Sequence, residues 1–138
     1  MKIADKPILL VEDDRVDVMT VKRALKEIHV SNPVVNAENG EDALKYLRDP
    51  DNVKPCIILL DINMPIMNGI EFLHVIKSSD QLKRIPVVVL TTSEEQQDKI
   101  NSFDLGAAGY LAKPVDYPQF VEVMRTFDAY WTISEVPE

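Results

Sequence analysis

The chain alternates between two kinds of hydrophobic pattern. Short, nearly continuous apolar runs occupy residues 8–11, 34–37, 57–60, 87–90 and 109–112, and each run is bounded by Pro, Gly, Asn or Asp. A strand that is covered on only one face would alternate apolar and polar residues. Continuous runs of this length are instead typical of parallel strands that are covered on both faces.

Between the runs, apolar residues recur at the three- and four-residue spacing of amphipathic helices. Such stripes are formed by Val18, Val21, Leu25 and Ile28; by Ala43, Leu44 and Leu47; by Ile70, Leu73 and Ile76; and by Phe120, Val123, Met124 and Phe127. Segment 94–105 has a thinner stripe and begins at Ser93, which with Gln96 resembles a capping box. The alternation predicts an α/β protein of the (βα)5 type, a doubly wound parallel five-stranded sheet with helices on both faces.

Composition narrows the class of protein. A length of 138 residues predicts a single domain, and the net charge of −8 argues against binding to nucleic acid, which requires a basic face. No apolar stretch approaches the roughly 18 residues needed to span a membrane, and the N-terminus lacks the apolar segment of a secretion signal. The single cysteine, Cys56, lies beside an apolar run and is expected to be a buried, reduced thiol. We therefore expect a cytoplasmic protein.

Four of the five predicted strands run into chemically useful side chains. Glu12 and Asp13 follow the first strand, Asp61 the third, Thr91 the fourth and Lys113 the fifth. Ligands of open α/β sheets bind outside the carboxyl ends of the strands, so these groups are expected to share one edge of the sheet.

These residue types together favour one chemistry. Carboxylates that converge to about 4–5 Å repel one another by roughly 3–4 kcal/mol at an effective dielectric constant near 20, so a cation is expected among them. Oxygen ligands without His or Cys favour Mg²⁺. With Asp61 as the nucleophile and Lys113 and Thr91 holding phosphoryl oxygens, the set suits formation of an aspartyl phosphate.

The residues also resemble a family. The segments ILLVEDD, LLDINMPIMNG, VVVLTTS and GAAGYLAKP are similar, in order and spacing, to the receiver domain of two-component response regulators. The resemblance covers about residues 7–130 and leaves a short tail at 132–138. It implies a flavodoxin-like fold with strand order 2-1-3-4-5. The run 34–37, which ends without a reactive group, would then lie at the edge of the sheet.

The resemblance also implies roles for individual residues. Asp61 would accept a phosphoryl group from a sensor histidine kinase or a phosphotransfer protein. Asp13 and Asp61 would bind Mg²⁺ directly, the backbone carbonyl of Asn63 would be the third protein ligand, and Glu12 would act through water. Thr91 and Tyr110 would form a switch pair, and Pro114 would be a cis proline after Lys113. Such a protein is a phosphorylation-controlled switch rather than an enzyme.

Several of these residues have plainer alternative roles. Asp13 or Asp14 could cap the first helix, since Asp is favoured at that position. Asp14 in particular lies outside the family's acid pair. Tyr110 could be an ordinary core residue, and Thr91 an ordinary strand residue. His29 and His74 have no metal-ligand partners at a useful spacing.

Two other functions share parts of the pattern. A phosphatase of the haloacid dehalogenase type also uses an Asp nucleophile with Mg²⁺, but it needs a second carboxylate two residues later, where this chain has Asn63. A flavodoxin-like binding module shares the topology, but the acids after the first strand would repel its phosphate.

The surface used for signalling is the remaining expectation. With no output module recognised, we expect a stand-alone receiver that forms a homodimer through segment 94–105, the strand at 109–112 and the last helix, with an unknown output protein as partner. The alternative is that Trp131 at the end of this helix closes the core and the protein stays a monomer. The aromatic end of the last helix and the segment LKRIPVVVLTTS are similar to the response regulators of bacterial phytochromes.

Overall fold

The computed structural model describes residues 6–27, 30–61, 67, 69–91, 109–112 and 118, and for 91 and 109–112 the description is confined to the backbone. Within these residues there are eight elements, which alternate between strand and helix as far as the fourth strand. They are β1 (Ile8–Val11), α1 (Arg15–Glu27), β2 (Val34–Ala37), α2 (Gly40–Arg48), β3 (Ile57–Asp61), α3 (Gly69–Lys77), β4 (Val87–Thr91) and β5 (Gly109–Ala112).

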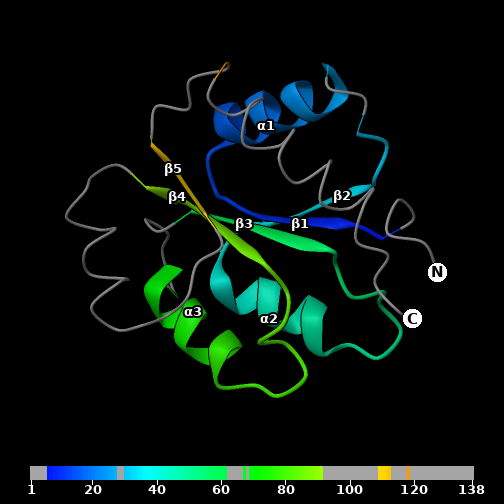
Figure 1. Ribbon diagram of the computed structural model, residues 1–138, viewed down its shortest axis with the longest axis vertical. Coiled ribbons are helices and arrows are strands. Elements are labelled where there is room, and N and C mark those ends of the chain that lie inside the picture. The colour runs from blue at the N-terminus through cyan, green and yellow to red at the C-terminus, as the bar shows by residue number, and fades with distance from the viewer. Residues whose placement is uncertain are drawn as a thin grey trace.

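All the strands pair in parallel in one sheet of order β2-β1-β3-β4-β5. Figure 1 shows α1 on one face of this sheet and α2 and α3 on the other. The predicted doubly wound fold and its strand order are therefore confirmed, and β2 lies at an edge as expected. Among the described residues, no helix has the length and apolar character needed to cross a membrane.

The apolar runs of β1, β3 and β4 are continuous because each of these strands contributes side chains to two hydrophobic cores, one on each face of the sheet. Successive strand residues point to opposite faces of a sheet. Leu9, Ile58 and Leu60 pack with α2 and α3 on one face, while Leu10, Leu59 and the residues of α1 pack on the other. Full burial of one such side chain stabilises the fold by about 1.5–3 kcal/mol.

The edge strand β2 departs from this rule. Val34 and Val35 are half-buried and Asn36 is exposed, so only Ala37 is buried. A strand at the edge has a neighbour on one side only and is less completely covered. Cys56, just before β3, is likewise half-buried rather than buried as predicted.

Local capping sets where two of the helices begin. The Asp14 Oδ1 atom accepts hydrogen bonds from the backbone amides of Val16, at 2.8 Å, and Asp17, at 3.1 Å. Asn39 caps α2 in the same way, because its Oδ1 accepts from the amide of Asp42 at 2.8 Å. Each cap satisfies amides that have no partner within the helix.

The predicted fourth helix at 94–105 and the last helix, with the aromatic residues at its end, lie outside the described residues. The expected dimer surface therefore stays a prediction.

Candidate functional site

Strand register brings the acids together. Val11 pairs with Leu60 across β1 and β3, so Glu12, the residue after Val11, lies beside Asp61 at the end of β3. The amide of Glu12 donates to the carbonyl oxygen of Ala37 at 2.9 Å, which holds the end of β1 against β2. Two carboxylates on neighbouring strands are thereby placed at the carboxyl edge of the sheet.

Glu12, Asp13 and Asp61 form an acid cluster in which one carboxylate oxygen from each residue lies within 4.8 Å of the others. Glu12 is fully buried and Asp61 is only 2% exposed, whereas Asp13 faces solvent. Two of the three carboxylates are thus shielded from solvent, and the cluster is open to solvent at Asp13. The predicted convergence of these three acids is what the structure shows.

Electrostatics make this arrangement a good cation site. At 4.8 Å and an effective dielectric constant near 20, two ionised carboxylates repel by about 3.5 kcal/mol. The repulsion is largest for the buried pair, Glu12 and Asp61, since water screens the exposed Asp13 more strongly. Carboxylate oxygens are the ligands that Mg²⁺ and Mn²⁺ prefer, so the donor set fits a hard divalent cation.

The two remaining strands end at the same edge. Asp61 pairs with Leu90, so Thr91 is one position beyond it on β4, and Thr91 in turn pairs with Ala112 at the end of β5. Tyr110 is part of β5 and pairs with Val89. The backbone therefore places position 91 next to the acid cluster.

Three predicted site residues, Asn63, Lys113 and Pro114, lie outside the described residues. Their assigned roles as a metal ligand, a phosphate-binding cation and a cis proline stay predictions.

Asp14 is not part of the cluster. It belongs to the next turn of the chain and caps α1 with its carboxylate, which agrees with the plainer role considered for it. His74 is exposed on α3, away from the acids.

One residue near the site was not predicted from the sequence. The Asn36 side chain on β2 donates to the carbonyl oxygens of Leu10, at 3.0 Å, and Glu12, at 3.1 Å. The sequence did show a polar residue within the apolar run 34–37. Exposure at the edge of a sheet explains such a residue equally well, so the sequence did not indicate a role near the acids.

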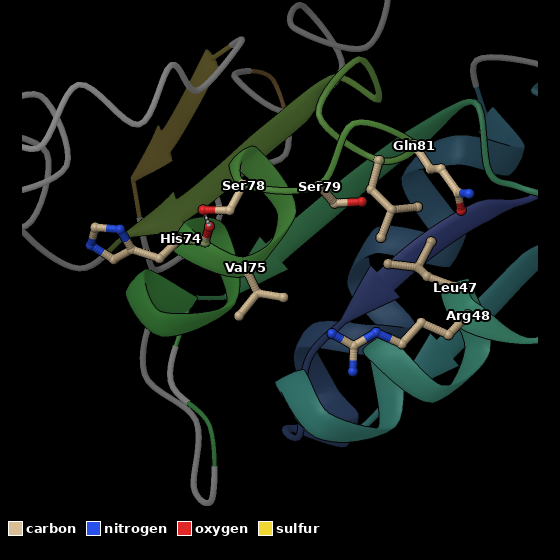
Figure 2. Close-up of a pocket in the computed structure, with 8 residues that line it drawn as sticks. Leu47, Arg48, His74, Val75, Ser78, Ser79 and Gln81 are labelled. Atoms are coloured by element: carbon tan, nitrogen blue, oxygen red, sulfur yellow. Dashed lines mark hydrogen bonds between the residues drawn. The ribbon is translucent and has the colours of Figure 1, made fainter.

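A separate groove of about 560 Å³ lies between the last turns of α2 and α3. Figure 2 shows Leu47 and Arg48 on one side of it and Val75 on the other, with the His74 imidazole directed away from Arg48. Helices in this fold run opposite to the strands, so the groove lies at the amino edge of the sheet. No acid-cluster residue lines it, and the acids lie at the opposite edge.

The fold and the acid cluster together define a doubly wound α/β protein with three acids, suited to a divalent cation, at the carboxyl edge of its sheet. The family model of the response regulator receiver domain matches residues 8–125, and the chain belongs to this family. It is therefore a receiver domain of two-component signalling, the class that is phosphorylated on an aspartate. This membership does not favour the phosphatase or the flavodoxin-like alternative.

Individual relatives agree with this assignment. The chain is 35% identical over 130 residues to Response regulator Rcp1 of Synechocystis, covering 91% of this chain and 88% of Rcp1. It is also similar to the Bacteriophytochrome response regulator RtBRR, with 40% identity, a TM-score of 0.83, and coverage of 97% of this chain and 84% of that one. The predicted likeness to phytochrome response regulators is thus confirmed.

Two further similar structures were solved in a phosphorylated and in a metal-bound form. A phosphorylated cyanobacterial phytochrome response regulator, RcpA, is 36% identical with a TM-score of 0.79, over 96% of this chain and 99% of that one. The Mn²⁺-bound form of Rcp1 is 34% identical with a TM-score of 0.79, over the same shares of the two chains.

Proposed function

We propose that this receiver domain accepts a phosphoryl group on Asp61 in a reaction that depends on a divalent cation, and that the modification changes its interaction surface. The observation that carries the proposal is the acid cluster of Glu12, Asp13 and Asp61 at the carboxyl edge of the sheet. The nearly complete burial of Asp61 at the end of β3 supports its role as the nucleophile, because burial fixes its direction of attack.

The proposed step is a phosphoryl transfer between two side chains. A carboxylate oxygen of Asp61 attacks the phosphorus atom of a phosphohistidine on a sensor kinase or phosphotransfer protein. A P–O bond forms, the P–N bond breaks, and the released imidazole nitrogen takes up a proton. Transfers of this kind depend mainly on positioning of the reacting groups and on stabilisation of their charge. The side chains at the carboxyl edge of the sheet would provide both.

The chain's own acids would hold the cation. Asp13 and Asp61 would bind it directly, Glu12 would bind through water, and the Asn63 carbonyl would complete the protein ligands. When bound, Mg²⁺ or Mn²⁺ offsets the charge of the acids and of the phosphoryl oxygens. The Mn²⁺-bound form of Rcp1 supports this choice of metal.

Thr91 and Lys113 would hold the phosphoryl oxygens after transfer. The aspartyl phosphate carries a charge of about −1.5 to −2 where the carboxylate carried −1, and it lies at the end of β3, beside position 91 on β4. Movement of Thr91 toward the new oxygens would let Tyr110 turn inward and would change the face that includes β5. A homodimer through this face, and an output protein that binds it, remain parts of the proposal.

Residues 1–138 are proposed to form one receiver domain with a short tail at 132–138, acting in the cytoplasm as a switch without turnover of a separate substrate. The solved structure of the phosphorylated RcpA supports the proposal that this chain is phosphorylated.

Phosphorylation with acetyl phosphate or a phosphorylated kinase in Mg²⁺ tests the proposal. Mass spectrometry should find one base-labile phosphate on Asp61, and both Asp61→Asn and removal of Mg²⁺ with EDTA should abolish it. Asp14→Ala is the matched acid control and should label like the unmodified protein. Labelling that persists in Asp61→Asn would refute the assignment.

A further inference from the structure

The end of β1 is joined to β2 by hydrogen bonds from one side chain, that of Asn36. The Nδ2 atom of Asn36 donates to the carbonyl oxygens of Leu10, at 3.0 Å, and Glu12, at 3.1 Å, and lies 3.4 Å from the carbonyl oxygen of Ala37. Leu10 and Glu12 are two residues apart, so both carbonyls face the same side of β1. An amide NH₂ group has two hydrogens and can serve both acceptors at once.

The Glu12 contact lies beyond the last residue of β1. The strand ends at Val11, and two hydrogen bonds restrain the residue that follows: the Glu12 amide donates to Ala37, and the Glu12 carbonyl accepts from Asn36. The carbonyl of Glu12 belongs to the peptide unit that joins it to Asp13. Two of the three acids in the cluster are therefore carried by a peptide unit that Asn36 holds.

We propose that Asn36 is a positioning residue for the acid cluster, in which its side-chain amide fixes the Glu12–Asp13 peptide unit and so preorganises the carboxylates for a divalent cation. The proposal rests on the function proposed above. It needs no contact between Asn36 and the metal, because second-shell hydrogen bonds of this kind act through the ligands they orient.

The segment just before β2 offers a matched control. Asn32 donates through its Nδ2 atom to the carbonyl oxygen of Lys6 at 2.8 Å, just before β1 begins. Both asparagines are 26 residues beyond a carbonyl that they bind near β1. Asn32 acts at the amino edge of the sheet and Asn36 at the carboxyl edge, where the acid cluster lies. A purely structural role predicts similar consequences for the loss of either amide.

The test compares Asn36→Leu, Asn32→Leu and Asn36→Gln in the full chain. Leucine has a similar size and no donor, while glutamine restores a donor on a longer side chain. Mn²⁺ affinity is measured from the electron paramagnetic resonance signal of free Mn²⁺, and stability from urea unfolding. Asn36→Leu is expected to bind Mn²⁺ about tenfold more weakly, Asn36→Gln to recover part of the loss, and Asn32→Leu to bind within about twofold of the unmodified protein.

Hydrogen exchange gives a second readout. In Asn36→Leu without metal, the Glu12 amide should exchange faster by about tenfold, because its strand end loses a restraint, whereas Asn32→Leu should leave that amide unchanged. Asn36 is exposed at the edge of the sheet, so Asn36→Leu is expected to stay folded. Circular dichroism checks that it does.

The possible outcomes distinguish failure of the positioning role of Asn36 from failure of the proposed function. Equal Mn²⁺ affinity in Asn36→Leu and Asn32→Leu, with the unmodified protein binding normally, would overturn the role of Asn36 and leave the acid cluster intact as a metal site. Absence of Mn²⁺ binding in the unmodified protein would overturn the proposed function itself. A loss confined to Asn36→Leu and relieved in Asn36→Gln supports the positioning role.

Discussion

Gly40, the first residue of α2, packs directly against Met67. The Gly40 amide donates to the carbonyl oxygen of Met67 at 3.4 Å, and a β-carbon placed on Gly40 would lie 2.9 Å from the Met67 Cγ atom. This contact joins the start of α2 to the chain shortly after Asp61. The need for glycine here comes from close approach and not from an unusual backbone conformation.

Gly40→Ala is therefore expected to destabilise the protein by about 1 kcal/mol, even though alanine is the better helix former. Urea unfolding measures the change. In a Met67→Ala background the same substitution should cost less, because the Cγ and Sδ atoms at 2.9 and 3.0 Å are gone and only the β-carbon of residue 67, at 3.1 Å, remains. An equal cost in both backgrounds would show that the contact with Met67 is not the cause.

Asp14 should behave as a helix cap and not as a metal ligand. Asp14→Ala is expected to lower the free energy of unfolding by about 0.5–2 kcal/mol, because two amides in the first turn of α1 lose their acceptor. Asn39→Ala should cost a similar amount at α2. Asp14→Asn keeps the accepting oxygen and should restore most of the stability, and Mn²⁺ affinity should change little in any of these variants. A large loss of affinity in Asp14→Asn would identify Asp14 as a ligand.

The acid cluster should destabilise the metal-free protein. Without divalent cations, Asp61→Asn is expected to raise the free energy of unfolding by on the order of 1 kcal/mol, because one of the repelling carboxylates becomes neutral. Added Mg²⁺ should stabilise the unmodified protein, by about 2.7 kcal/mol at 100 times its Kd, and should have little effect on Asp61→Asn.

Asp51→Asn removes an acid that is exposed in a turn outside the cluster, and it provides the charge-matched control. Its thermal unfolding should respond to Mg²⁺ as the unmodified protein does. A lower stability of Asp61→Asn than of the unmodified protein in EDTA would contradict this prediction. It would show that attraction between Asp61 and a basic side chain outweighs the repulsion among the acids.

The Cys56 thiol should react slowly with disulfide reagents, and its titration should affect the free energy of unfolding at alkaline pH. Burial raises the pKa of its thiol from 9.0 to about 11, although backbone hydrogen bonds act in the opposite direction. At pH 8 the folded protein should react with a disulfide reagent about 100-fold more slowly than the unfolded chain, because the thiolate is the nucleophile.

The same pKa change fixes the sign of the pH dependence. Between about pH 9 and 11 the unfolded chain releases the thiol proton while the folded chain keeps it, so the free energy of unfolding falls as the pH rises. Cys56→Ser removes this titration, and its stability should fall less over that window. Parallel stability curves for the two proteins would contradict the raised pKa of Cys56.

The sequence by itself indicated the strands and helices that the structure describes and the acids that follow two of the strands. A strand buried on both faces must be apolar at every position, so runs such as 57–60 are visible without any knowledge of their neighbours. A carboxylate at the end of such a run has a large desolvation cost, and Asp61 therefore stands out as functional. The cap at Asp14 is local too, because a cap needs only the amides two or three residues later.

Only the tertiary structure decided which strand ends meet and what supports them. The pairing of Val11 with Leu60, which places Glu12 beside Asp61, joins residues far apart in the chain, and no local pattern encodes it. The half-burial of Cys56 depends in the same way on how completely neighbouring segments cover the start of β3. Asn36 is the clearest case: its exposed position is ordinary for an edge strand, and its hold on the Glu12 carbonyl exists only because β2 pairs with β1 in this register.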